Sequence, residues 1–193
     1  MNQEEILQIM RITGVLKEGH FLLTSGRHSR GYMQCASVLQ YPQYTARLCE
    51  ELASRFADVQ IDTVIGPAMG GVILSYEMGR ALKCRAIFAE RVDGKMSLRR
   101  GFTIEPGEKV LIAEDVVTTG GSVKEVIELL KEAEGDLQGV VSLIHRSDSC
   151  LHLGTRFEPL LRMNIESYTP EDCPLCKAGI PINKPGSRGL KSI

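Results

Sequence analysis

One stretch of the chain, residues 110–122, combines acidic, hydroxyl and glycine residues in an order that suits ligand binding. It reads Val-Leu-Ile-Ala-Glu-Asp-Val-Val-Thr-Thr-Gly-Gly-Ser, and an amphipathic segment, residues 123–133, follows it. The apolar start predicts a buried strand, and the amphipathic segment predicts a helix. Small residues before a helix let backbone N–H groups surround an anion at the positive end of the helix dipole. This order predicts a phosphate site.

The two adjacent acids of this stretch, Glu114 and Asp115, would repel a phosphate that touched them. We therefore expect them to accept hydrogen bonds from neutral sugar hydroxyls beside the phosphate. A phosphate next to a sugar predicts a phosphoribosyl ligand. A plain glycine turn after a strand is the alternative, but two acids, two threonines, two glycines and a serine in one run favour ligand binding.

Several segments of the chain resemble one protein family. Residues 110–122 resemble the 5-phosphoribosyl-1-diphosphate (PRPP) motif of type I phosphoribosyltransferases. Residues 19–32, Gly-His-Phe-Leu-Leu-Thr-Ser-Gly-Arg-His-Ser-Arg-Gly-Tyr, are similar to the amino-terminal segment of orotate phosphoribosyltransferases. The likeness continues through residues 65–71, 90–101 and 144–147. It implies one domain over residues 1–193, with a core at about 42–150 and a small hood from about 1–41 and 151–193.

The resemblance also implies an activity, a cofactor and a set of binding residues. The implied reaction transfers the phosphoribosyl group of PRPP to N1 of orotate, with Mg²⁺ held by PRPP and not directly by the protein. Arg146 is implied to bind the orotate carboxylate, Tyr32 to cover the pyrimidine ring, and Thr118 to touch both ligands. The implied PRPP-binding residues are Arg91, Glu114, Asp115, Val116, Val117, Thr118, Thr119, Gly120, Gly121 and Ser122.

A basic, glycine-bounded segment, residues 91–101, has two interpretations. It is a solvated hairpin, or, as the resemblance implies, a lid that completes the neighbouring site of a homodimer. Lys95 and Asp115 are then the implied catalytic residues. Val92 and Ser97 stand where many relatives have a lysine and a histidine. Thr24 and Gly70 also stand where the resemblance leads us to expect lysines. The loop that contains Gly70 follows the strand at residues 63–65, and without a lysine it would contact pyrophosphate through its backbone alone.

Two other functions are compatible with these motifs. A phosphoribosyltransferase acting on a purine base would leave Arg146 and residues 21–32 without their implied roles. A non-catalytic regulator could bind PRPP or a nucleotide and control RNA or transcription. The net charge of −1 and the absence of a recognisable appended binding domain count against the regulator.

Composition predicts an ordinary globular protein. The chain has 193 residues, of which 43% are hydrophobic and 24% charged. The near-neutral charge predicts neither a nucleic-acid nor a membrane partner. Residues 1–5 are acidic where a secretory signal would be basic, and no apolar run approaches the roughly 20 residues that span a bilayer. We expect a cytoplasmic protein.

Apolar strands alternate with helices along the chain, which predicts an α/β fold with a mostly parallel sheet covered on both faces. Ligands then bind at the carboxyl ends of the strands. Asn2 and Glu5 predict a capping box for the first helix. Further helices are expected over residues 42–56, 70–82 and 123–133, strands over 21–23, 32–35, 63–65, 85–89, 110–113 and 139–145, an edge strand over 157–163, and an irregular tail from Pro170.

The six cysteines fall into two groups. Cys35, Cys49 and Cys84 lie singly in apolar or helical segments, which is typical of small buried side chains. Cys173 and Cys176 have the spacing of half a zinc site, whose other ligands could be Cys150 and His152. Because there is no second C-x-x-C and a predicted strand separates the two pairs, reduced structural thiols are the favoured interpretation.

Overall fold

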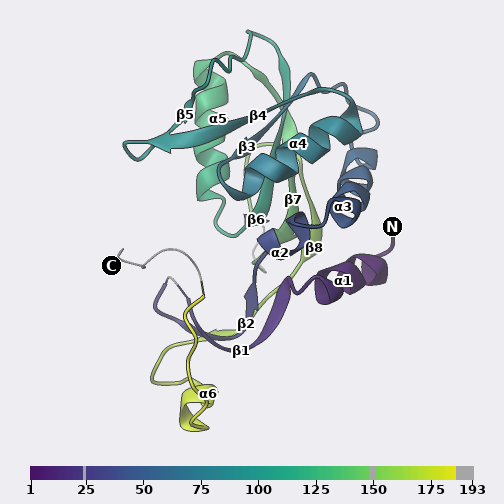
Figure 1. Cartoon of the computed structure of the whole chain (residues 1–193). Helices are drawn as coiled ribbons and strands as arrows, with labels where there is room; N and C mark the ends of the chain where they lie inside the picture. The colour runs from purple at the N-terminus through teal and green to yellow at the C-terminus, as the bar shows by residue number, and fades with distance from the viewer. Residues whose placement is uncertain (24, 148–150, 186–193) are drawn as a thin grey trace.

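The computed structural model describes residues 1–23, 25–147 and 151–185, and its main element is a six-stranded sheet. The strand order is β5-β4-β3-β6-β7-β8 (Figure 1). β5 (Lys95–Leu98) is antiparallel to its neighbour, and the parallel strands are β3 (Thr63–Pro67), β4 (Arg85–Val92), β6 (Lys109–Val117), β7 (Asp136–His145) and β8 (Phe157–Arg162). The predicted α/β fold with a mostly parallel sheet is confirmed.

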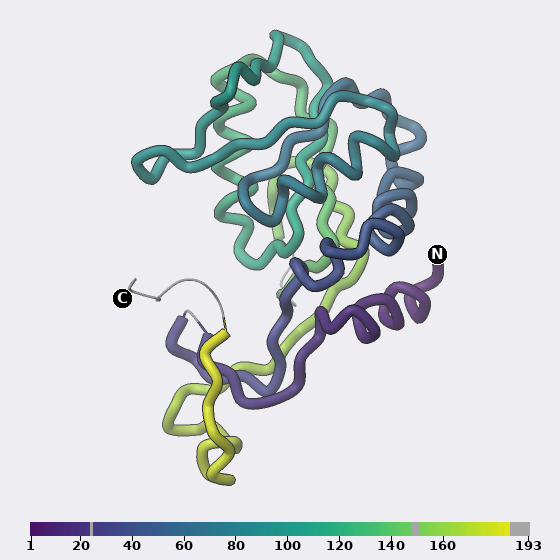
Figure 2. Tube along the Cα trace, in the orientation of Figure 1, coloured from purple at the N-terminus to yellow at the C-terminus, as the bar shows by residue number. Residues whose placement is uncertain are grey.

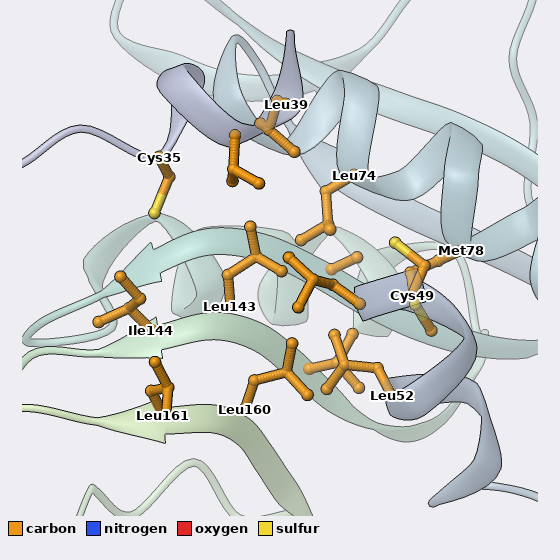
Figure 3. Packing of buried hydrophobic residues seen from close by; sticks show 14 of the residues in the cluster. Cys35, Leu39, Cys49, Leu52, Leu74, Met78, Leu143, Ile144, Leu160 and Leu161 are labelled. Carbon is orange, nitrogen blue, oxygen red and sulfur yellow. The ribbon is translucent and has the colours of Figure 1, made fainter. Parts of the chain in front are cut away.

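Helices cover both faces of this sheet. Along β6, Leu111 and Ala113 join one apolar cluster, whereas Val110 and Ile112 join another, because successive side chains of a strand point to opposite faces. The first cluster is drawn in Figure 3. It packs against α1 (Gln3–Ile12), α2 (Ala36–Leu39), α3 (Pro42–Ser54) and α4 (Gly70–Leu82), and the second packs against α5 (Gly121–Glu132).

A second, three-stranded sheet lies at one end of the molecule (Figure 1). It consists of β1 (Leu16–Leu22), β2 (His28–Met33) and β9 (Ser167–Tyr168), all antiparallel. The segment after α6 (Pro174–Lys177) runs beside β1 (Figure 2), where Asn183 donates its N–H to the His20 carbonyl at 2.7 Å and accepts from Leu22 at 2.8 Å. The carboxyl-terminal part of the described chain is therefore tied to the β1–β2 hairpin.

The predicted helices agree closely with the structure. Asn2 and Glu5 form the expected capping box, with hydrogen bonds of 2.8 and 2.9 Å. Helix α3 begins at Pro42, as expected, and α4 has the predicted limits of Gly70 and Leu82. Cys35 and Cys49 are buried, as predicted, whereas Cys84 is half-buried. In the described part of the chain no helix has the length and apolar character that a membrane crossing needs.

Several features of the structure differ from the sequence prediction. The expected strand 32–35 lies instead at 28–33, because polar residues from His28 onward pair through their backbone with both β1 and β9. β6 continues beyond Ala113 to Val117, because Val116 and Val117 pair with β7. β8 forms the expected edge strand beside β7, so its residues belong to the larger sheet, although we expected residues 151–193 in the hood. The tail from Pro170 contains the short helix α6.

Candidate functional site

The turn between β6 and α5 forms a small polar cavity at the positive end of a helix. This cavity of about 50 Å³ is lined by Glu114, by residues 116–118 and by residues 120–123. Gly120 has φ of 76°, a conformation that side chains other than glycine rarely adopt. Among the described residues no side chain caps α5, and its first turn has no acid, in contrast to the capping box of α1. The first-turn N–H groups therefore suit an anion.

The two acids of the motif lie in different surroundings, because neighbouring residues of β6 face opposite ways. Glu114 is only 9% exposed and lines the small cavity. Burial raises its pKa to about 9, with further contributions from the negative charge of Asp115 and the hydrogen bond between the two side chains. Glu114 is therefore neutral at pH 7 in the ligand-free chain. Asp115 is half-buried and its Oδ1 accepts from the Val116 N–H at 2.8 Å.

The loop between β3 and α4 packs directly against Asp115. A Cβ atom added to Gly70 would lie 2.4 Å from Cγ of Asp115, so only glycine leaves that carboxylate in place. Helix α4 also lacks a side-chain cap and has no acid in its first turn. Gly70 thus lets the Asp115 carboxylate lie directly against an uncapped helix start.

A larger cavity of about 310 Å³ adjoins the same turn and holds Arg146. Arg146 follows β7, and its N–H donates to the Val117 carbonyl at 2.8 Å, which keeps its backbone beside the end of β6. Within residues 1–23, 25–147 and 151–185 no carboxylate is paired with its side chain, and the alternative partner, Asp148, lies outside them. The other lining residues are Leu23, Ser25, Ser29, Gly31, Thr118, Ser147, Asn164, Ile165 and Ser167.

Tyr32 lies apart from this lining. Ser29 and Gly31 of β2 face the cavity, so Tyr32, one residue further along the strand, points to the other face. Its ring packs against Phe21, with the centroids 5.7 Å apart. The structure therefore brings Thr118 and Arg146 together, as the sequence predicts, but not Tyr32.

The predicted lid is the hairpin formed by β4 and β5, which projects from the sheet in Figure 1. Arg91 forms two hydrogen bonds with the Glu125 carboxylate of α5, at 2.5 and 2.8 Å. Lys95 Nζ lies 3.6 Å from Glu132, at the last turn of α5. Arg100 pairs with Glu90 at 3.1 Å. Thus Arg91 and Lys95 both contact α5 of their own chain, and Lys95 does so at the end of the helix opposite the small cavity.

The chain is similar in sequence to known proteins of one family. Residues 38–152 match the phosphoribosyl transferase domain family. An orotate phosphoribosyltransferase of Desulforamulus reducens is 57% identical over 190 residues, covering 98% of this chain and 100% of that protein. This chain belongs to the orotate phosphoribosyltransferase family. A Caldicellulosiruptor saccharolyticus orotate phosphoribosyltransferase is 58% identical over 99% of this chain and 100% of that protein.

A solved orotate phosphoribosyltransferase shares the fold. The Mycobacterium tuberculosis H37Rv protein, in complex with inorganic phosphate, superposes with a TM-score of 0.69 at 19% identity. The likeness covers 83% of this chain and 95% of that chain. At this identity it bears on the fold alone, and the central sheet with its flanking helices is the fold of type I phosphoribosyltransferases.

The sequence prediction did not include several residues that line the larger cavity of this orotate phosphoribosyltransferase family member. Ser29 and Gly31 could have been found from the two-residue alternation of β2, because they lie on the face opposite Tyr32. No sequence pattern indicates Asn164 and Ile165, because they follow the edge strand β8 in an irregular segment. Only the three-dimensional arrangement brings that segment to Arg146.

Proposed function

We propose that this chain transfers the 5-phosphoribosyl group of PRPP to N1 of orotate, producing orotidine 5′-monophosphate and pyrophosphate in pyrimidine nucleotide synthesis. The observation that carries the proposal is that Thr118 lines both cavities. One cavity suits a phosphate, and the other offers a half-buried guanidinium to a carboxylate. A ligand in each would therefore meet at Thr118. The cytoplasm is the proposed location of this synthesis.

Each part of PRPP has a counterpart among the predicted residues. The 5′-phosphate would bind the N–H groups and hydroxyls of residues 118–122, and the ribose hydroxyls would donate to Asp115. The start of α4 at Gly70 would face the pyrophosphate through N–H groups that no side chain caps. Orotate would place its carboxylate on Arg146, in a two-point contact that a guanidinium suits better than an ammonium.

The reaction is a substitution at C1 of the ribose. Orotate N1 loses its proton to a substrate oxygen or to water, and its lone pair forms the new N–C bond as the bond from C1 to the pyrophosphate oxygen breaks. Positive charge develops on the ribose ring and negative charge on the leaving pyrophosphate. The helix-terminal N–H groups and Lys95 would stabilise the negative charge. Holding two anionic reactants in line accounts for much of the remaining acceleration.

Mg²⁺ fits this site as a partner of the substrate. The available donors are carboxylate and hydroxyl oxygens, the ligands that Mg²⁺ prefers, and Asp115 is half-buried beside Gly70 with no side chain between them. When bound to PRPP, Mg²⁺ would neutralise charge on the pyrophosphate. Asp115 would then orient the ribose hydroxyls next to that complex.

We also propose that the chain works as a homodimer in which the hairpin completes the neighbouring site. Lys95 contacts the end of α5, and the 12-residue helix is roughly 18 Å long at 1.5 Å per residue, so the phosphate cavity of the same chain is too distant. Met69, Ile73 and Tyr76 recur at helical spacing along α4 and are 84%, 50% and 71% exposed. An apolar stripe of this kind is suited to burial by a second subunit.

Subunit exchange tests the lid. Lys95→Ala and Asp115→Ala homodimers should each be nearly inactive, and mixing them should restore activity, because one site of each mixed dimer is then intact. Native mass spectrometry checks that mixed dimers form. If mixed dimers form without recovery of activity, the hairpin serves its own subunit.

A substrate panel tests the activity itself. The purified protein is supplied with PRPP, Mg²⁺ and one base at a time: orotate, uracil, adenine or xanthine. We expect pyrophosphate release with orotate alone, because only orotate offers Arg146 a carboxylate. A higher rate with a purine, or PRPP binding without turnover of any base, would overturn the proposal.

A further inference from the structure

Two histidines and two cysteines converge on one point in the smaller sheet, remote in sequence from the phosphate site. His20 comes from β1, His28 from β2, and Cys173 and Cys176 flank the start of α6. One nitrogen or sulfur atom from each residue lies within 4.8 Å of all the others. The two histidines and Cys173 are buried, and Cys176 is exposed. Four such side chains seldom meet in a protein interior unless a shared partner holds them together.

The distances between these atoms match a tetrahedral metal site. His20 Nε2 lies 3.1 Å from His28 Nδ1, 3.5 Å from Cys173 Sγ and 3.8 Å from Cys176 Sγ, and His28 Nδ1 lies 3.2 Å from Cys176 Sγ. Around a tetrahedral zinc ion, the usual bond lengths place two nitrogens about 3.4 Å apart and a nitrogen and a sulfur about 3.6 Å apart. An ion fits between the four atoms with only small movements.

A hydrogen bond outside the cluster orients one of the ligands. His20 Nδ1 lies 2.7 Å from the carbonyl oxygen of Ile180. Because a carbonyl only accepts, Nδ1 carries the proton and donates it, and the lone pair of Nε2 is left pointing to the other three side chains. A metal-bound histidine typically donates its second ring N–H to such a partner.

We propose that His20, His28, Cys173 and Cys176 bind a structural Zn²⁺ ion. Two thiolates and two neutral imidazoles form a complete tetrahedral set and leave no open position for a substrate. The ion would join β1 and β2 to a segment that lies about 150 residues later in the chain. The site belongs to the smaller sheet and is separate from the residues proposed for catalysis.

This assignment departs from the expectation of reduced thiols. Cys176 and Cys173 pair with the β1–β2 hairpin, and not with His152, which follows β7 and is exposed. Cys150, the other ligand considered, lies outside the described residues. The sequence separation of the two pairs conceals the cluster, because the histidines are eight residues apart within a hairpin and lack the spacing of a familiar zinc motif.

Metal content and cobalt absorption test the site together. The untagged full-length chain is expressed in zinc-supplemented medium, purified without chelators, and measured by mass spectrometry for bound metal. We expect one zinc per chain, and a loss of at least nine-tenths of it in His20→Ala and in Cys176→Ser. Cys176 is exposed, so its substitution removes little packing and should leave the fold intact. Cys84→Ser and His152→Ala are matched controls that should keep their zinc.

Cobalt gives a readout that does not depend on catalysis. Chain refolded with Co²⁺ under reducing conditions should show the strong visible absorption of a tetrahedral site and the charge-transfer bands of thiolate ligands. Both should disappear in Cys176→Ser and persist in Cys84→Ser. A wild-type chain that binds less than a tenth of an equivalent of zinc and gives no such cobalt spectrum would overturn the proposal. Full zinc retention by His20→Ala and Cys176→Ser would overturn it equally.

Discussion

Replacing Glu114 with glutamine should stabilise the folded chain, by an amount that grows with pH. Burial and the neighbouring charge of Asp115 raise the pKa of Glu114 from its ordinary value of 4.5 to about 9. Between these two values the folded chain keeps a proton that the unfolded chain has released. The free energy of unfolding therefore falls as pH rises through this window. Below pH 4.5 the carboxyl is neutral in both states, and this loss is absent.

The size of the effect follows from the two pKa values. Each pH unit above 4.5 costs the wild-type chain about 1.4 kcal/mol of unfolding free energy from this one group. At pH 7 the cost is roughly 3 kcal/mol, a large share of a typical domain's stability. Glutamine is neutral at every pH and its side-chain oxygen can still accept from the Asp115 N–H, as Glu114 does at 3.2 Å. The variant should therefore escape the loss.

Urea unfolding of both chains across pH provides the measurement. The stability difference between Glu114→Gln and wild type should widen by about 1 kcal/mol or more per unit from about pH 5.5 to about pH 8.5. Glu128→Gln is the control, since Glu128 is an exposed α5 residue paired with Lys131 at 2.8 Å and should show a flat difference. A flat difference for Glu114→Gln as well would mean that the folded chain holds this carboxyl ionised, and would refute the reasoning.

Substitutions at three positions probe the ligand contacts. Asp115→Asn should reduce kcat/KM for PRPP by a factor corresponding to about 1.5–3 kcal/mol, with an unchanged far-UV spectrum; an unchanged kcat/KM would exclude the ribose contact. Gly70→Ala should raise the KM for PRPP because its methyl group displaces the Asp115 carboxylate, and in an Asp115→Ala background it should have no further effect, as a double-mutant cycle would show. Arg146→Ala should raise the KM for orotate by a factor corresponding to roughly 2–5 kcal/mol without affecting PRPP binding, and Arg146→Lys should recover only part of the loss. An equal loss of PRPP binding would assign the arginine a structural role.

Local sequence signals predict the elements that local interactions determine. The Asn2–Glu5 capping box and Pro42 give the helix starts, because a cap or a proline acts within one turn. The end of β6 was placed too early because two acids read as the end of an apolar strand. Pairing with β7, which no local pattern reveals, carries the strand on to Val117.

The two cavities of the candidate site differ in how far the sequence predicts them. The phosphate cavity comes from one continuous segment, so the sequence predicted all of its lining residues except Val123, which begins the expected helix. The larger cavity combines the β1–β2 turn, the end of β7 and the segment after β8, and only Thr118 and Arg146 were identified in advance. Tyr32, which the resemblance implied as an orotate contact, does not line this cavity, because the register of β2 determines which alternate residues face it.

The same alternation connects the proposed zinc site to the proposed orotate site. On β2, Ser29 and Gly31 face the larger cavity, and His28, on the opposite face, joins the cysteine cluster. A metal that holds His28 and His20 in place would therefore hold the register of the strand whose other face lines the cavity. Besides the two backbone hydrogen bonds between β1 and Asn183, the hairpin is extended only by β9, which adds two paired residues to its edge. Cross-linking the hairpin to α6 is thus a way to keep a small sheet rigid beside a ligand, where its own apolar core is limited.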